Sequence, residues 1–263
     1  MSFRDKNIWI TGASSGIGEA LAYELSNRGA NLILSSRRKE ALMEVKNNCK
    51  TPSKVHIITL DLAETDQLSG KAREALSIFG HIDYLFNNGG ISQRSEAIDT
   101  KIEVIRKVME INFFGSVALT KAVLPSMIER QSGHIVVTSS VMGKFGTRLR
   151  SSYAASKHAL HGYFDSLRQE HYDDNIHISL VCPGYIKTNV TKNALEGDGS
   201  KHNKMGKGQE NGMPAEEFAK KLIPKILSEK EEIYIGGKEI WGVYLKRFFP
   251  RLLNRMLRNA EVT

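Results

Sequence analysis

Short apolar runs alternate with longer amphipathic segments along the whole chain. Seven of the short runs have an apolar centre and predict β-strands, over residues 7–11, 30–36, 55–61, 82–88, 134–140, 176–182 and 232–236. Such runs are typical of strands covered by helices on both faces, as in a parallel sheet. The sequence therefore predicts a buried, mainly parallel sheet of seven strands.

The segments between the strands repeat apolar residues at helical spacing. They predict helices over residues 16–28, 38–49, 64–79, 100–130, 151–173 and 215–228. Alternating strands and helices imply right-handed crossovers that place helices on both faces of the sheet. We expect an α/β protein with a single doubly wound Rossmann-type domain over residues 1–237, followed by a basic amphipathic tail over residues 238–263.

One stretch departs from this alternation. Residues 196–213, "EGDGSKHNKMGKGQENGM", follow the sixth strand and lose all apolar periodicity. A linker at this point would need a further domain, but only about 50 residues remain. Long irregular segments in compact domains often cover a binding site. We therefore expect a mobile loop over a site, within a substrate lid of about residues 185–213.

Glycines gather where the first strand meets the first helix. The run "TGASSGIG", residues 11–18, places Gly12, Gly16 and Gly18 around this junction. Glycine lets the backbone turn tightly and approach a ligand, and the helix N-terminus presents unpaired N–H groups to phosphate. This position favours a dinucleotide site, although the G-x-x-x-G-x-G spacing differs from the commoner G-x-G-x-x-G fingerprint.

A tyrosine and a lysine lie one helical turn apart in "SSYAASK", residues 151–157. Most pairs at the spacing of Tyr153 and Lys157 are surface neighbours, which stabilise a helix by about 0.2–0.5 kcal/mol. In a proton-transfer site the ammonium would instead lower the pKa of the phenol from its ordinary value of about 10. The pair alone leaves both interpretations open.

Four more motifs follow in a consistent order along the chain. They are a serine before the tyrosine, an asparagine after the fourth strand, a Pro-Gly pair after the sixth strand and a threonine beyond it: Ser140, Asn112, Pro183–Gly184 and Thr188. Together with the glycine turn and the Tyr–Lys pair, they resemble the short-chain dehydrogenases/reductases over roughly residues 5–236. The resemblance extends to the NADP-preferring, hydroxysteroid-dehydrogenase-like subgroup. The family's "NNAG" reads "NNGG" at residues 87–90, where we expect little functional effect.

The resemblance implies a catalytic group of four residues. Tyr153 would pass a proton to or from the substrate oxygen, and Lys157 would favour its phenolate and bond the nicotinamide ribose. Ser140 would hydrogen-bond the substrate oxygen, and Asn112 would hold a water that connects the lysine to solvent. The structural alternatives are a strand-end turn for Ser140 and an ordinary polar helix position for Asn112.

The end of the second strand bears on the choice of cofactor. It reads "LILSSRRKE", with Arg37 and Arg38 where NAD-preferring members of the family usually place an acid. A guanidinium suits the 2′-phosphate of NADP, whereas the alternative is a solvated charge pair at a helix start. We expect NADP(H), in contact with Gly12, Ser14, Ser15, Gly16, Ile17, Gly18, Arg37, Arg38, Asp61, Leu62, Asn88, Gly89, Tyr153, Lys157, Pro183, Gly184, Ile186 and Thr188.

The surrounding loops do not identify a substrate. We expect a small molecule with a carbonyl or alcohol group on a moderately apolar body. The candidate lining residues are Ser140, Met142, Phe145, Leu149, Tyr185 and Val190. We expect no metal, because Cys49 and Cys182 form no CxxC motif and the histidines lack a metal-binding spacing.

The net charge is +8, and much of it lies late in the chain. Residues 244–258, "YLKRFFPRLLNRMLR", carry five basic residues and no acid. No nucleic-acid-binding motif accompanies them, so we expect no nucleic-acid partner. Their apolar residues fall largely on one side of a helix and the arginines on another. This pattern predicts either a helix lying on an anionic membrane surface or one packed on protein.

The main hypothesis is an NADP(H)-dependent oxidoreductase that interconverts an alcohol and a carbonyl, with Tyr153 as general acid/base. The rivals are a catalytically idle NADP-sensing binding protein and a membrane-surface scaffold that acts through the tail. The complete group of four residues argues against the idle protein. No apolar segment precedes the first strand, so we expect a cytoplasmic protein, peripheral at a membrane if the tail binds lipid. The resemblance also implies a homo-oligomer, either a dimer or a tetramer.

Overall fold

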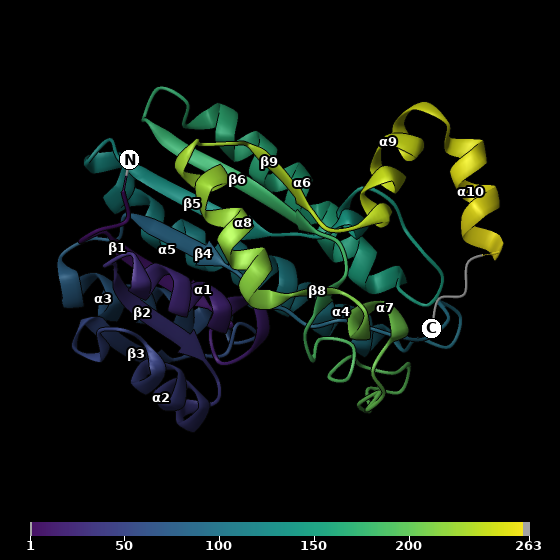
Figure 1. The fold of residues 1–263 in the computed structure, drawn as a ribbon, viewed down its shortest axis with the longest axis horizontal. Coiled ribbons are helices and arrows are strands. Elements are labelled where there is room, and N and C mark those ends of the chain that lie inside the picture. Colours follow the sequence, from purple (N-terminus) through teal and green to yellow (C-terminus); the bar gives the residue numbers. More distant parts are fainter. Residues whose placement is uncertain (1, 260–263) are drawn as a thin grey trace.

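A single seven-stranded sheet forms the centre of the protein. The computed structural model describes residues 2–259, and its strands follow the order β3-β2-β1-β4-β5-β6-β9, with every neighbouring pair parallel (Figure 1). The strands are β1 Asn7–Thr11, β2 Asn31–Ser36, β3 Val55–Thr59, β4 Tyr84–Asn87, β5 Gly133–Thr138, β6 Ile176–Pro183 and β9 Glu232–Ile235. All seven predicted strands are confirmed, and the sheet is parallel throughout.

Helices cover both faces of this sheet (Figure 1). One face carries α1 Gly16–Asn27, α2 Lys39–Asn48 and α8 Ala215–Leu227. The other carries α3 Thr65–Phe79, α5 Gly115–Glu129 and α6 Ser151–Glu170. The predicted helix over 100–130 is divided into α4 Ile102–Met109, a π-helical turn Glu110–Phe114 and α5. The predicted single doubly wound α/β domain is confirmed.

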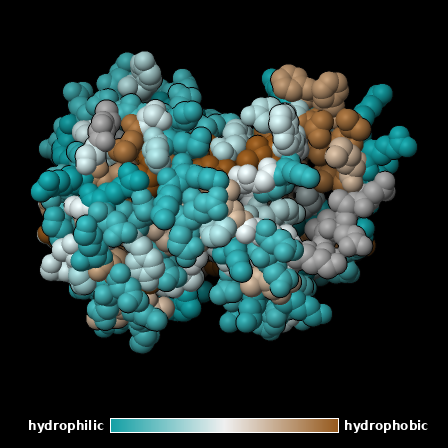
Figure 2. All heavy atoms as spheres, in the orientation of Figure 1, coloured by the Kyte–Doolittle hydropathy of each residue, from teal (hydrophilic) through white to brown (hydrophobic). Residues whose placement is uncertain are grey.

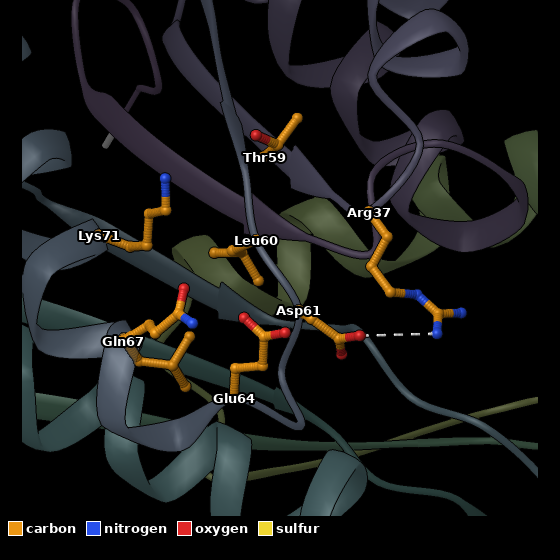
Figure 3. A pocket seen from close by; sticks show the side chains of 8 residues that line it. Arg37, Thr59, Leu60, Asp61, Glu64, Gln67 and Lys71 are labelled. Atoms are coloured by element: carbon orange, nitrogen blue, oxygen red, sulfur yellow. Dashed lines mark ion pairs between the residues drawn. The ribbon is translucent and has the colours of Figure 1, made fainter.

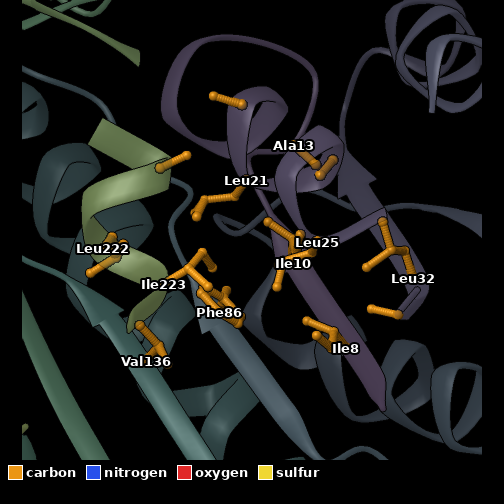
Figure 4. Close-up of a cluster of buried hydrophobic side chains, with 14 of the residues drawn as sticks. Ile8, Ile10, Ala13, Leu21, Leu25, Leu32, Phe86, Val136, Leu222 and Ile223 are labelled. Atoms are coloured by element: carbon orange, nitrogen blue, oxygen red, sulfur yellow. The ribbon is translucent and has the colours of Figure 1, made fainter. Parts of the chain in front are cut away.

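Two apolar cores lie on opposite faces of the sheet, because successive strand residues point to opposite sides. On β1, Ile8 and Ile10 pack towards α1 and α8, while Trp9 between them joins the core under α3 and α5. Figure 4 shows the first core, where Leu222 and Ile223 of α8 face the strands. Full burial of each such side chain stabilises the fold by about 1.5–3 kcal/mol.

The helical run Ile102–Glu129 is long and apolar enough to cross a membrane by length and composition. Half of its apolar window is nevertheless buried within the protein. Leu119 and Val123 are among its residues in the core under the sheet. Partial burial of this kind is typical of a helix that packs on the core of a folded domain.

The predicted lid over residues 185–213 contains short pieces of structure. Strand β7, Ile186–Lys187, pairs with β8, Met213–Pro214, and α7 spans Lys207–Glu210. Leu195 forms isolated bridges with Gln93, in the loop after β4, and with Lys201. The lid is therefore joined to the loop that follows a central strand of the sheet.

The tail forms two helices, α9 Trp241–Phe248 and α10 Pro250–Asn259, and residues 260–263 lie outside the described part. Leu253 is only 3% exposed and packs with Val141 and Phe145. Phe248 and Phe249, in contrast, are 68% and 62% exposed. The apolar residues of the tail, expected largely on one side, therefore divide between a face packed on the domain and a face turned to solvent.

Candidate active site

The glycine turn between β1 and α1 leaves no room for side chains at its contact points. Gly12 has a φ of +64°, a conformation that side chains rarely adopt. A Cβ added at Gly18 would lie against the carbonyl oxygen of Gly12 and 2.7 Å from Asn88 Nδ2. The helix N-terminus is thus held directly against the strand end, and helix N-termini are positions at which proteins commonly bind phosphate.

Thr11, which the sequence did not single out, joins the ends of two neighbouring strands. Its hydroxyl accepts hydrogen bonds from the backbone N–H groups of Asn88 and Gly89, both at 3.0 Å. It also donates to the carbonyl of Phe86 at 3.2 Å. On the far side of Asn88, Thr138 Oγ1 donates to its Oδ1 at 3.2 Å. The predicted cofactor residues Asn88 and Gly89 are therefore fixed beside the glycine turn.

Asn112 lies in the π-helical turn and fastens the loop after β4. Its Nδ2 donates to the carbonyl of Ile91 at 2.9 Å, and its Oδ1 accepts from the Ile91 N–H at 2.8 Å. Nδ2 also donates to Ser156 Oγ on α6 at 3.0 Å. A methyl group at Gly90 would lie 3.0 Å from Asn112 Oδ1 and 3.7 Å from Lys157 Nζ. Gly90, the last residue of "NNGG", therefore faces Asn112 and Lys157.

Ser140 and Tyr153 lie together at the junction of the β5 end and α6. Ser140 begins the 3₁₀ turn Val141–Gly143, where its hydroxyl accepts from the Met142 N–H at 3.2 Å. Burial raises the pKa of the Tyr153 phenol, and a hydrogen bond with the Ser140 side chain partly opposes this. At neutral pH the phenol is therefore protonated and can act as a proton donor.

Lys157 follows Tyr153 by one turn of α6 and is 4% exposed. Its Nζ lies 5.7 Å from the centre of the Tyr153 ring and donates to the carbonyl of Thr138 at 2.7 Å. Burial lowers the pKa of the ammonium to about 8. Since a buried charge without a counter-ion is costly, this ammonium is suited to bind hydroxyl groups and a partly charged phenol.

Of the predicted cofactor contacts, Arg37 and Asp61 line a cavity of about 320 Å³ (Figure 3). Thr59, Leu60 and Lys71 also line this cavity. Arg37 NH1 lies 3.8 Å from Asp61 Oδ2, and this arginine side chain is largely exposed. Arg38 instead bonds the glycine turn, with NH2 at 3.1 Å from the Ser14 carbonyl and 3.0 Å from its hydroxyl. The two arginines therefore differ in what they contact.

The loop after β6 approaches the glycine turn from the other side. Pro183 ends the strand, and a Cβ at Gly16 would lie 2.9 Å from Thr188 Cγ2. Glu239 holds this loop from the start of the tail, because its Oε1 accepts from the N–H groups of Tyr185 at 2.7 Å and Gly237 at 3.0 Å. The predicted cofactor contacts of the glycine turn and of the loop after β6 are thus brought together.

The candidate substrate residues in the loops fall into three groups. Phe145 and Met142 pack against the tail helices, and Phe145 is buried there with Leu253. Tyr185 is exposed and lies beside Gly208 of the lid. Leu149, just before α6, and Val190, after β7, are partly buried. The structure therefore makes Phe145 part of the contact between the domain and its tail.

A second polar cluster, next to Ser139, is formed by Lys144, His161, Asp165 and Glu232. His161 Nε2 lies 3.0 Å from Ser139 Oγ, and Lys144 forms an ion pair with Glu232. Ligand atoms of His161, Asp165 and Glu232 lie within 4.8 Å of one another. A hydrogen bond with His161, followed by one with Lys144, keeps the pKa of the Glu232 carboxylate low, and the Lys144 ammonium is the counter-ion of that carboxylate. We therefore assign no metal to this cluster, which supports the end of β5.

A family model described as short chain dehydrogenase matches residues 6–199, the part of the chain that carries the glycine turn, Asn112, Ser140 and the Tyr–Lys pair. The chain therefore belongs to the short-chain dehydrogenase family of oxidoreductases.

Individual relatives support this assignment. "Dehydrogenase/reductase SDR family member 7B" of Danio rerio is 41% identical over 97% of this chain and 85% of its own length. "Dehydrogenase/reductase SDR family protein 7-like" of Drosophila melanogaster is 41% identical over 94% of this chain and 78% of its own length. Among solved structures, levodione reductase superposes with a TM-score of 0.81 at 27% identity, covering 91% of this chain and 99% of the reductase.

Proposed function

We propose that the protein is an NADP(H)-dependent oxidoreductase that interconverts an alcohol and a carbonyl, with Tyr153 as general acid/base. The observation that carries the proposal is the joining of Ser140, Tyr153 and Lys157 at the carboxyl end of the sheet, beside the glycine turn. In open α/β sheets, ligands bind at this end of the strands.

Ser140, Tyr153, Lys157 and Asn112 have different roles in the proposed reaction. The bound nicotinamide supplies or accepts the hydride. Tyr153 donates a proton to the carbonyl oxygen in the direction of reduction, and Ser140 holds that oxygen by a hydrogen bond. Lys157 favours the phenolate while it is charged, below about pH 8. Asn112 holds the loop before it and the start of α6 in register through Ile91 and Ser156.

Arg37 supports the preference for NADP(H). It lies at the rim of the cavity in Figure 3, where it forms an exposed ion pair with Asp61. Exposed ion pairs contribute about 0–1 kcal/mol, so the guanidinium can turn to a 2′-phosphate at little cost. Solved neighbours at 22% and 21% identity contain NAD and NADP respectively, and they share the fold.

Arg37→Ala should weaken NADPH binding about 10-fold to 100-fold and leave NADH binding within about twofold, because a charge-assisted phosphate contact contributes about 1.5–3 kcal/mol. The measurement is the fluorescence titration of each reduced cofactor. Arg106→Ala, at an exposed position of α4, is the matched control and should change neither affinity. Equal losses for NADPH and NADH would show that Arg37 supports the fold and not the phosphate.

The activity itself is tested by screening aldehydes, ketones and alcohols with both cofactors, following absorbance of the reduced nicotinamide. Turnover with NADPH supports the proposal. Cofactor binding without turnover of any member of the panel would favour the idle binding protein.

We further propose that the tail lies on an anionic membrane surface. Figure 2 shows apolar side chains gathered over α9 and α10. The exposed ones are Trp241, Tyr244, Phe248, Phe249, Leu252 and Met256. Five basic residues and no acid accompany them over residues 244–258, so a symmetric contact with a second copy would bring like charges together. Aromatic rings next to lysine and arginine suit a lipid interface.

Replacing Trp241, Phe248 and Phe249 by serine should abolish sedimentation with vesicles that contain anionic lipid, while wild type sediments and is released as salt rises. Leu253 is kept, because its removal would open the contact with Phe145. Ile98→Ser combined with Tyr172→Ser, at other exposed apolar positions, is the control and should bind like wild type. If wild type does not sediment but forms a dimer that the triple variant lacks, the exposed face is a subunit interface.

A further inference from the structure

Arg150 is a buried cation directly before the helix that carries Tyr153. It is 7% exposed, and its NH1 donates to two neutral oxygens, Ser92 Oγ at 2.6 Å and the Gln93 carbonyl at 3.4 Å. Within residues 2–259 the structure gives it no ion pair with a carboxylate. Burying a charge costs free energy unless the charge is paired, so binding an anion at this guanidinium would be favourable.

The backbone directly before the buried Arg150 has an unusual conformation. The preceding Leu149 has a φ of 62°, a left-handed conformation that residues with a side chain rarely adopt. Its carbonyl accepts from the Ser95 N–H at 3.2 Å, which holds this turn to the loop after β4. Conformations of this kind persist where the surrounding structure imposes them, and they are frequent at functional sites.

The groups near Arg150 make the position electropositive. Burial is the main cause that lowers the pKa of its guanidinium, and the like charge of Arg94 adds to it. Arg94 is also buried, in the loop that pairs with the lid. The phenols of Tyr153 and Tyr185 act on the pKa of Arg150 in the opposite direction. No acid occupies the first turn of α6.

We propose that Arg150, with Arg94 beside it, binds an anionic group of the substrate, a carboxylate or a phosphate, while the reacting carbonyl lies at Tyr153. The inference rests on the proposed function and specifies its substrate class. A guanidinium presents two parallel N–H donors that match either anion, and it remains charged when buried more readily than a lysine. Exposed lysines of the lid, Lys187, Lys192, Lys201 and Lys204, would draw such a substrate towards the site.

The alternative is that Arg150 only holds the loop at Ser92 and Gln93. Matched substrates separate the two roles. The probes are 4-formylbenzoate, its uncharged methyl ester and 4-formylphenyl phosphate, each reduced with NADPH by wild type, Arg150→Met and Arg148→Met. Arg148 is exposed, pairs with Glu96 and serves as the control.

We expect wild type to prefer at least one anionic aldehyde over the ester, by about tenfold or more in kcat/KM. Arg150→Met should abolish that preference through KM, and Arg148→Met should retain it. Which anionic aldehyde is preferred distinguishes a carboxylate from a phosphate. An equal loss for the anions and the ester in Arg150→Met, or a wild type that prefers the ester, overturns the inference and leaves the proposed reaction standing.

If none of the three aldehydes is reduced, the proposed reaction fails for this panel, and binding tests the site directly. Calorimetric titration of the wild-type protein with NADPH present should detect 4-formylbenzoate or 4-formylphenyl phosphate and show at least tenfold weaker binding in Arg150→Met. Absence of binding to wild type, or equal binding to both proteins, overturns the inference.

Discussion

Tyr153→Phe should lower the rate of carbonyl reduction by about 10²–10⁴-fold, the contribution expected of a general acid. The substitution removes the hydroxyl and keeps the ring that lies 5.7 Å from Lys157 Nζ, so NADPH affinity should remain within about twofold. The measurements are the rate constant of a single turnover and the Kd from fluorescence titration. Because burial raises the pKa of Tyr153, the wild-type rate of reduction should not fall between pH 6 and about 8 through loss of its proton.

The matched control is Tyr163→Phe, the same chemical change ten residues later on α6. Tyr163 packs against Phe113 and Phe164, away from Ser140. It should retain most of the wild-type rate. If Tyr153→Phe kept more than a tenth of the activity, the proton would have to come from another group, and Lys157, with its pKa lowered to about 8, would be a candidate.

Much of the fold is predictable because burial on both faces leaves a strong apolar signal in each strand. Ile8, Trp9 and Ile10 are all buried, although they serve two different cores. Element ends are less predictable. Helix α6 shows this, since it is expected to reach residue 173 but ends at Glu170, just before His171 Nδ1 lies 2.7 Å from Asp174 Oδ2.

The sequence predicts one continuous helix over residues 100–130 and does not predict the π-helical turn that contains Asn112. In this turn the Asn112 side chain makes two hydrogen bonds with the backbone of Ile91, twenty-one residues away along the chain. The same holds for Arg150, whose burial depends on contacts with Ser92 and Gln93. Motif spacing identifies residues that match a known pattern. It does not reveal contacts between residues that are distant in the sequence and come together only in the folded chain.

The close contact between the glycine turn and α1 leads to the second large effect. Gly18→Ala would place a methyl group against the Gly12 carbonyl, 2.8 Å from its carbon, and 2.7 Å from Asn88 Nδ2. Two of these neighbours are backbone atoms, so the helix start has to move away from the strand end. Overpacking of this kind costs about 1–3 kcal/mol, which we expect as a loss in the free energy of unfolding measured with urea.

The same movement displaces the N–H groups that would receive the cofactor phosphate, so NADPH affinity should fall about tenfold or more. Gly162→Ala on α6 is the control, because a methyl group there meets no atom within 4 Å. Alanine in an exposed helix interior should stabilise the protein by about 0.5–1 kcal/mol and leave NADPH binding unchanged. If Gly18→Ala bound NADPH as tightly as wild type, the phosphate would not lie on this turn, and the cofactor position proposed here would be wrong.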